Sequence, residues 1–141
     1  MHRKQVIIAF IICTVLFQQS CTLWRSNCID LNQEVEYNGT STYILNPVNN
    51  LVPSFDTTCN GIKYTIGVVN CRINFIITND ANFSCDRLTI GMPLPDKFKN
   101  RKIKSVPGWG KFVQVKYDWY AACFSREDDF IIDCFFKFRE F

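Results

Sequence analysis

The chain has 141 residues, 48% of them hydrophobic and 15% aromatic, with a formal net charge of +3. Loss of the expected leader removes Arg3 and Lys4 and no acid, which leaves about +1 and indicates no nucleic-acid partner. His2, in that leader, is the only histidine, so the mature chain cannot use a histidine base, nucleophile partner or metal ligand. Because C-x₂-C pairs and phosphate-binding glycine loops are also missing, the sequence predicts a non-enzyme with no cofactor and no metal.

Residues 1–22 are predicted to be a secretory signal peptide. "MHRK" supplies positive charge, "QVIIAFIICTVLF" an apolar run and "QQSCT" a polar exit, in the order of an export signal. The apolar run is shorter than the about 20 residues that span a bilayer, so no stable membrane insertion is expected after cleavage. Residues 23–141 then form a single β-rich domain, secreted or held in the ER lumen.

The cysteine count depends on where the signal is cut. Cleavage after Thr22 leaves six cysteines, which in an exported chain predict three disulfides with the pairing open. These six are Cys28, Cys59, Cys71, Cys85, Cys123 and Cys134. Cleavage after Ser20 would add Cys21 as an odd thiol suited to a covalent dimer, and the even count is favoured.

Two sequons agree with export. Asn38-Gly-Thr40 and Asn82-Phe-Ser84 both fit the N-x-[ST] acceptor pattern and stand among turn-forming residues. In a eukaryotic secretory pathway, glycans on Asn38 and Asn82 would mark solvent-facing edges of the domain.

Alternating apolar residues predict short strands along the first two thirds of the chain. Residues 42–45 and 84–90 form two of them. Between these, 62–68 and 71–77 alternate in opposite phases, and the change just after Gly67 predicts a bulge or tight turn. No stretch keeps a helical apolar period over a helical length.

Residues 91–110 are predicted to be a long irregular loop. Five cations around two aromatic side chains suggest a surface for an extracellular or ER-lumenal protein, or for a sulfated glycan. The predicted partner-binding residues are Lys97, Phe98, Lys99, Arg101, Lys102, Lys104 and Trp109. The alternative is a solvated loop without a ligand.

The C-terminal third predicts a hairpin. Residues 113–123 and 130–138 alternate around the polar "SREDD", with Cys123 and Cys134 both facing the core and bridging elsewhere rather than to each other. Taken together, the strands predict an all-β, disulfide-stabilised β-sandwich, with an immunoglobulin-like topology favoured.

"CFSREDDFIIDCFFKFREF" resembles the C-terminal hairpin of the secreted immunoglobulin-like accessory proteins of coronaviruses, and "NGIKYTIGVVNC" is similar to their preceding strand. The likeness covers roughly a quarter of the chain. The loop 91–110 and Cys134 depart from that pattern. The resemblance implies an immune-modulating protein that acts in the ER lumen or outside the cell.

The leading functional hypothesis is a secreted, non-enzymatic protein that binds a host or cell-surface protein. A second hypothesis is a carrier of an apolar small molecule, because thirteen phenylalanines could line a cavity between sheets. A third is a secreted toxin or effector whose disulfides provide durability.

Overall fold

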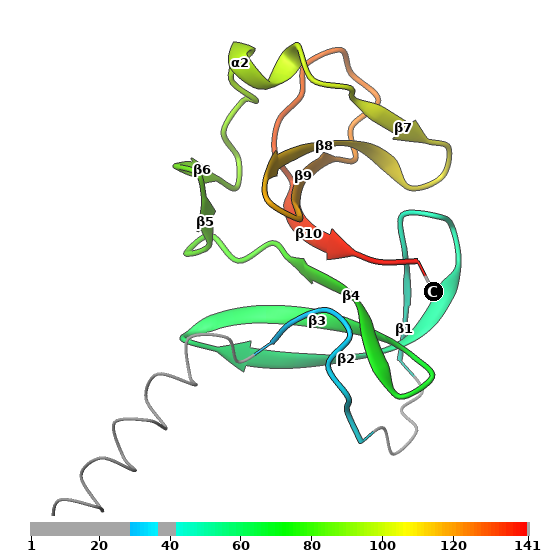
Figure 1. The fold of residues 1–141 in the computed structure, drawn as a ribbon. Helices are drawn as coiled ribbons and strands as arrows, with labels where there is room; N and C mark the ends of the chain where they lie inside the picture. Colours follow the sequence, from blue (N-terminus) through cyan, green and yellow to red (C-terminus); the bar gives the residue numbers. More distant parts are fainter. Residues whose placement is uncertain (1–28, 37–41, 141) are drawn as a thin grey trace, which may run out of the picture.

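A computed structural model describes residues 29–36 and 42–140 (Figure 1). The predicted signal peptide, Cys28 and the Asn38 sequon lie outside these residues. Within the described part, no helix has the length and apolar character needed to cross a membrane.

Strands make up 50% of the structure and helix only 4%, which confirms the predicted all-β class. Eight strands form one antiparallel sheet in the order β1-β2-β3-β4-β10-β9-β8-β7, while β5 and β6 pair separately. The elements are β1 (Tyr43–Leu45), β2 (Leu51–Cys59), β3 (Ile62–Val69), β4 (Arg72–Thr78), β5 (Ser84–Cys85), β6 (Leu88–Thr89), α2 (Asp96–Lys99), β7 (Lys104–Val106), β8 (Gly110–Lys116), β9 (Trp119–Cys123) and β10 (Cys134–Phe138). The eight strands form one continuous sheet rather than two packed sheets, so a sandwich of immunoglobulin-like topology stays a prediction.

Three hairpins turn through two residues that both have positive φ. They are Asn60–Gly61 between β2 and β3, Asn70–Cys71 between β3 and β4, and Asp86–Arg87 between β5 and β6. Two positive φ angles match the right-handed twist of the flanking strands, and asparagine and glycine tolerate them best. Short local turns therefore fix the register of these strand pairs.

The predicted irregularity after Gly67 is confirmed. The register between β3 and β4 shifts between Gly67 and Val68, which pair with Phe75 and Ile73. Asn74 is therefore the extra residue of a β-bulge, and its buried Oδ1 has no hydrogen-bond partner within the described residues.

The sheet is curled so strongly that its two edges meet. Trp109, in the turn between β7 and β8, donates from Nε1 to the carbonyl oxygen of Leu45 in β1 at 3.0 Å. Asn49 donates from Nδ2 to the carbonyl oxygen of Pro107 at 2.8 Å. We call this junction the seam. Side chains, rather than a strand ladder, close it.

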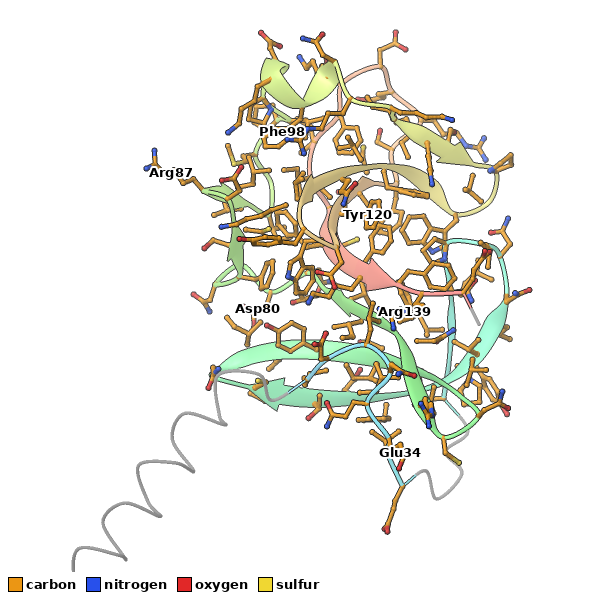
Figure 2. All side chains as sticks on the ribbon, in the orientation of Figure 1. Glu34, Asp80, Arg87, Phe98, Tyr120 and Arg139 are labelled. Atoms are coloured by element: carbon orange, nitrogen blue, oxygen red, sulfur yellow. The ribbon has the colours of Figure 1, made fainter. Side chains whose placement is uncertain are left out.

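The inside of the curl is an aromatic core, here called the concave cluster. Its buried members are Phe75, Trp109, Phe112, Ala122, Cys134 and Phe136, with Ile44, Leu45, Ile77, Val106, Tyr120 and Phe138 packed against them. The rings of Phe75, Phe112 and Trp109 meet Phe136 edge to face at 5.0–5.9 Å. Tyr120 lies stacked on Phe136 at 5.1 Å, between β8 and β10 in Figure 2.

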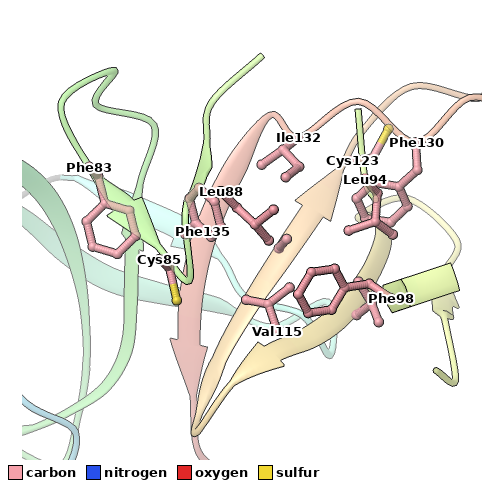
Figure 3. Close-up of a cluster of buried hydrophobic side chains, with 12 residues drawn as sticks. Phe83, Cys85, Leu88, Leu94, Phe98, Val115, Cys123, Phe130, Ile132 and Phe135 are labelled. Carbon is pink, nitrogen blue, oxygen red and sulfur yellow. The ribbon is translucent and has the colours of Figure 1, made fainter. Parts of the chain in front are cut away.

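The outside of the curl carries a second core, the outer cluster, beneath β5, β6 and α2 (Figure 3). Its buried members are Phe83, Cys85, Leu88, Leu94, Phe98, Val113, Val115, Ala121, Cys123, Phe130, Ile132 and Phe135. Alternate residues of β9 and β10 therefore enter different cores: Phe135 joins the outer cluster and Phe136 the concave cluster. The predicted alternation is correct within β10 itself, where it divides two cores rather than core from solvent. It is wrong for Phe130 and Ile132, which were expected on the same face as Cys134 and Phe136 but lie in the outer cluster, because β10 begins only at Cys134.

The segment 29–36 covers a third group of apolar residues, on β3 and β4. Asn32 N donates to the Ile73 carbonyl at 2.7 Å, and Val35 N donates to the Cys71 carbonyl at 3.0 Å. This segment therefore extends the sheet beside the start of β4, where β10 does not reach.

The prediction of three disulfides is wrong for four of its six cysteines. Cys71, Cys85, Cys123 and Cys134 are free thiols, while Cys59 is disulfide-bonded. Cys71 was expected to face inward, but it lies exposed in the β3–β4 turn.

The geometry explains why the three buried thiols do not pair. Cys134 lies opposite Ala122, one residue from Cys123, so the two thiols enter opposite faces of the sheet. Cys85 and Cys123 share the outer cluster but lie at its opposite ends in Figure 3. A disulfide needs Cα atoms about 4.4–6.8 Å apart and side chains that point toward each other.

Candidate partner-binding site

The two aromatic residues expected to anchor a partner are core residues. Phe98 is 0% exposed, on the side of α2 that faces the sheet (Figure 2), and Trp109 is 8% exposed at the seam. An interface anchor must be accessible before binding, so the prediction of these two as contact residues is wrong. Aromatic side chains in a sequence loop cannot be separated from core residues by composition alone.

Three of the five predicted cations are used within the fold. Lys97 is 3.5 Å from Asp86, and Lys99 is 2.9 Å from Asp96. Arg101 Nη1 donates to the carbonyl oxygens of Gln114 and Val115 at 2.9 and 3.0 Å, and its guanidinium lies over the Phe98 ring. Arg101 thus attaches the residues after α2 to β8, Lys97 links α2 to the β5–β6 turn, and the Lys99 pair lies within α2. Arg101 is therefore best understood as a structural residue.

Lys102 and Lys104 are exposed, and neither forms an ion pair within the described part of the chain. Lys104 stands on β7, one of the two edge strands of the sheet. Lysine on an edge strand also discourages unwanted strand pairing, so its charge does not by itself indicate a ligand.

A different residue, Phe124, presents an aromatic ring to solvent. It directly follows β9 and is 47% exposed. Its ring meets Trp109 edge to face, with centroids 5.2 Å apart, and its backbone N–H donates to Asp133 Oδ2 at 2.6 Å. Trp109 at the seam thus supports the ring, and Asp133, just before β10, fixes the Phe124 backbone.

Two open depressions flank Phe124; together with its ring they are called the Phe124 surface. One, of about 510 Å³, is lined by Ser105, Val106, Pro107, Gly108, Trp109, Gly110, Lys111, Phe124, Ser125 and Arg126. The other, of about 620 Å³, is lined by Ile44, Thr65, Ile77, Asn79, Phe124, Ser125, Asp133 and Cys134. The second opens onto the concave cluster between β1 and the residues that follow β9.

The rim of the Phe124 surface carries charges of both signs. Lys111 Nζ donates to the carbonyl oxygen of Glu127 at 2.7 Å, which ties the segment after β9 to β8. Arg126 is exposed, and Asp133 holds the Phe124 backbone. An apolar centre with a polar, hydrogen-bonded rim is the usual composition of a protein-binding site.

The Phe124 surface has no evident catalytic arrangement. Burial raises the pKa of the Cys134 thiol far above its ordinary value, with the Asp133 charge adding to the effect, so the sulfur stays protonated at neutral pH. Across the described residues, no three histidine, cysteine, aspartate or glutamate side chains form a group that could hold a metal ion.

The sequence pattern did not identify Phe124 as a surface residue, because it stands between a strand and the polar "SREDD". One signal was available: Phe124 directly follows Cys123, the last inward-facing residue of its strand, so the alternation does not predict that its ring is buried. Its exposure depends on Trp109, which lies 15 residues earlier in the chain and comes close only through folding.

Comparison with protein-family models, with curated proteins and with solved structures finds no match. The resemblance to coronavirus accessory proteins therefore stays a hypothesis, and the function must be argued from the chain's own surface.

Proposed function

We propose that this chain is a secreted, non-enzymatic protein that binds another protein through the Phe124 surface. The observation that carries the proposal is the half-exposed Phe124 ring, fixed between two open depressions. The predicted export signal places the partner outside the cell or in the ER lumen. An immune-modulating role, and a sandwich of immunoglobulin-like topology, belong to this proposal as its finer form.

The energetics favour a protein partner. Burying an aromatic side chain removes a large apolar area from water at about 25 cal/mol per Å², and a ring already fixed loses little entropy on binding. The depressions on either side could each receive a side chain of the partner. Central aromatic residues surrounded by polar contacts typically dominate the affinity of such interfaces.

A carrier of an apolar molecule is the second candidate. The 620 Å³ depression has the size of a ligand site, and Ile44, Ile77 and Cys134 give it an apolar floor. However, the phenylalanines of the two clusters pack against one another rather than around a void. Native mass spectrometry of the secreted protein would detect a retained lipid, whereas the protein-binding proposal expects none.

Saturable binding to cells tests the main proposal. The purified secreted chain is titrated onto cultured cells, alongside Phe124→Ala and the matched aromatic control Tyr117→Ala. Tyr117 is 80% exposed in the β8–β9 turn and lines neither depression. We expect Phe124→Ala to weaken binding at least about tenfold and Tyr117→Ala to leave it unchanged.

Treatment of the cells identifies the kind of partner. Trypsin should abolish the binding sites, whereas heparan-sulfate lyases should leave them. Loss of binding only after the lyases would favour a sulfated glycan instead. Equal binding by wild type and Phe124→Ala, with melting temperatures confirming both folds, would contradict the assignment of the site.

A further inference from the structure

The turn between β4 and β5 is fixed by its backbone and by one carboxylate. Asp80 Oδ2 accepts from Lys63 N at 3.0 Å, and Oδ1 accepts from Asn82 N at 2.9 Å. The Asp80 carbonyl accepts from Phe83 N at 3.0 Å. The two backbone hydrogen bonds to the carboxylate lower the pKa of the Asp80 carboxyl, the one from Lys63 most and the one from Asn82 next. The side-chain amide of Asn82 makes a further, weaker hydrogen bond to Asp80, so the backbone donors supply most of what fixes the turn.

Phe83 determines which way its neighbours face. It is buried in the outer cluster, with ring centroids 4.8 Å from Trp119 and 5.2 Å from Phe135. Because Phe83 points inward, Asn82 and Ser84 on either side of it are exposed. The first and third residues of the sequon thus share the solvent side, and the middle residue holds the turn to the core.

We propose that Asn82 is an N-glycosylation site and that its glycan lies at the end of the outer cluster opposite Cys123 and the neighbouring Phe124 ring. The amide Nδ2 forms a bond to the anomeric carbon of an oligosaccharide, the bond from that carbon to a lipid pyrophosphate breaks, and Nδ2 loses one proton. The donor is a lipid-linked oligosaccharide of the ER membrane. The product amide keeps one N–H, and none of the backbone contacts of the turn is lost.

The position of the glycan follows from the fold. Asp80, two residues from Asn82, is bonded to the start of β3 (Figure 2). In Figure 3, Phe83 lies at the opposite end of the outer cluster from Cys123, which precedes Phe124. A glycan on Asn82 would stand beside the polar depression lined in part by Lys63, Thr78 and Asn79. Asn79 also lines the 620 Å³ depression of the Phe124 surface. The glycan would therefore border the far side of that depression and leave the Phe124 ring itself accessible.

Occupancy is tested on the full chain expressed with a C-terminal tag in cultured mammalian cells. Asn82→Gln and Ser84→Ala should each migrate faster than wild type by the mass of one glycan. After treatment with peptide-N-glycosidase, wild type and both variants should migrate together. Ser84→Thr should retain the step. The matched control is Asn79→Gln, which changes an exposed asparagine of the same turn outside any sequon.

Export and glycosylation are separated by a second version, in which residues 1–22 are replaced by a leader of proven export. If only the version with the replaced leader carries a glycan at Asn82, then Asn82 is a glycosylation site but residues 1–22 do not direct export. Asn82→Gln with wild-type mobility in both versions would overturn the inference. This inference depends on export but not on the partner of Phe124, so it can fail without affecting that proposal.

Discussion

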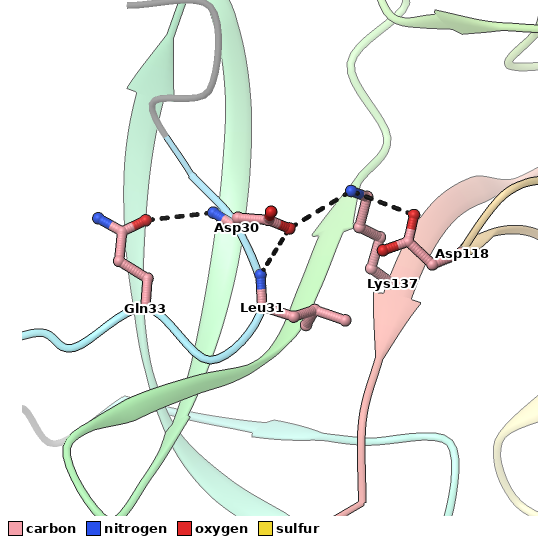
Figure 4. A network of polar contacts seen from close by, with 5 residues as sticks. All are labelled: Asp30, Leu31, Gln33, Asp118 and Lys137. Atoms are coloured by element: carbon pink, nitrogen blue, oxygen red, sulfur yellow. Dashed lines mark hydrogen bonds and ion pairs between the residues drawn. The ribbon is translucent and has the colours of Figure 1, made fainter. Parts of the chain in front are cut away.

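The position of Lys137 is decided by three neighbours rather than by the sequence pattern. On alternation alone it is an outward, solvated cation. In the structure its side chain is only 16% exposed, with Nζ 3.2 Å from Asp118, 3.5 Å from Asp30 and 5.1 Å from the Trp119 ring centroid (Figure 4). The ammonium thereby joins the segment 29–36 to the β8–β9 turn.

Replacing Lys137 with methionine should lower the free energy of unfolding by about 1–2 kcal/mol, because two ion pairs and a cation–π contact are lost while the packing of the stem remains. Denaturant titration measures the loss. Lys137→Arg should recover part of it, since it restores the charge. A stability equal to wild type at low salt would show that solvent screens these contacts completely.

The four free thiols of residues 29–36 and 42–140 should differ in reactivity. Cys71 is exposed, whereas Cys85, Cys123 and Cys134 are buried, and burial raises the pKa of Cys85 and Cys134. A thiol reagent should therefore label Cys71 first in the folded protein, and the buried three only after unfolding.

Peptide mapping by mass spectrometry, with and without denaturant, identifies the labelled residues. Cys71→Ser should remove the fast phase and keep the slow one. Fast labelling of Cys134 in the native protein would show that the 620 Å³ depression reaches its sulfur.

At the scale of the elements, the alternation of apolar residues predicted the central strands of the sheet better than the short elements at its edge and on its outer face. The strand runs of β3, β4 and β10 were predicted because apolar residues alternate there, and the bulge because the phase changes at Gly67. The prediction of 113–123 and of 84–90 as single strands is wrong, because a two-residue turn divides the first into β8 and β9 and the second into β5 and β6. β2 was missed, since Pro53 and the polar Asp56–Thr58 stretch hide its alternation. α2 and β7 were missed inside 91–110 because four-residue and three-residue elements carry too little periodicity to detect.

The candidate site could not be predicted for a related reason. Whether Phe98, Trp109 or Phe124 is exposed depends on which distant strand packs against it, and alternation reports only the two faces of one strand. With apolar residues on both faces of β9 and β10, the pattern could not say which of the two cores each residue enters.

The bulge gives a prediction at this scale. A Cβ on Gly67 would lie 3.0 Å from Val52 Cγ2 and 3.1 Å from Phe75 Cβ, both tighter than ordinary contacts. Gly67→Ala should therefore destabilise the protein by about 1–3 kcal/mol through overpacking. Thermal unfolding of the secreted variant measures this.

A double variant separates steric crowding from backbone effects. Val52→Ala removes the nearer contact, so Gly67→Ala should cost less in that background than alone. Strictly additive losses would mean that the crowding is relieved elsewhere.

At the scale of the whole molecule, the seam closes the curl, and Trp109 is its main contact. Trp109→Phe keeps an aromatic ring in the concave cluster but leaves the Leu45 carbonyl without its donor. We expect a loss of about 1–3 kcal/mol and faster hydrogen exchange of the β1 amides.

Hydrogen exchange read by mass spectrometry locates the effect. Asn49→Ala, which removes the exposed hydrogen bond of the seam, should accelerate exchange less. Uniformly faster exchange across β3 and β4 would instead mean that the seam and the sheet open as one unit.

The strand order also determines when each strand can pair during synthesis. β4 is complete at Thr78, but its other neighbour, β10, is the last strand of the chain to be made. During synthesis, the edge of β4 that will pair with β10 therefore stays unpaired while residues 79–133 are added. Phe75, on β4, is among the residues left without their partner strand during this time. Nascent chains halted at Asp133 should remain open to protease between β4 and β5, and the addition of β10 should close that site in one step.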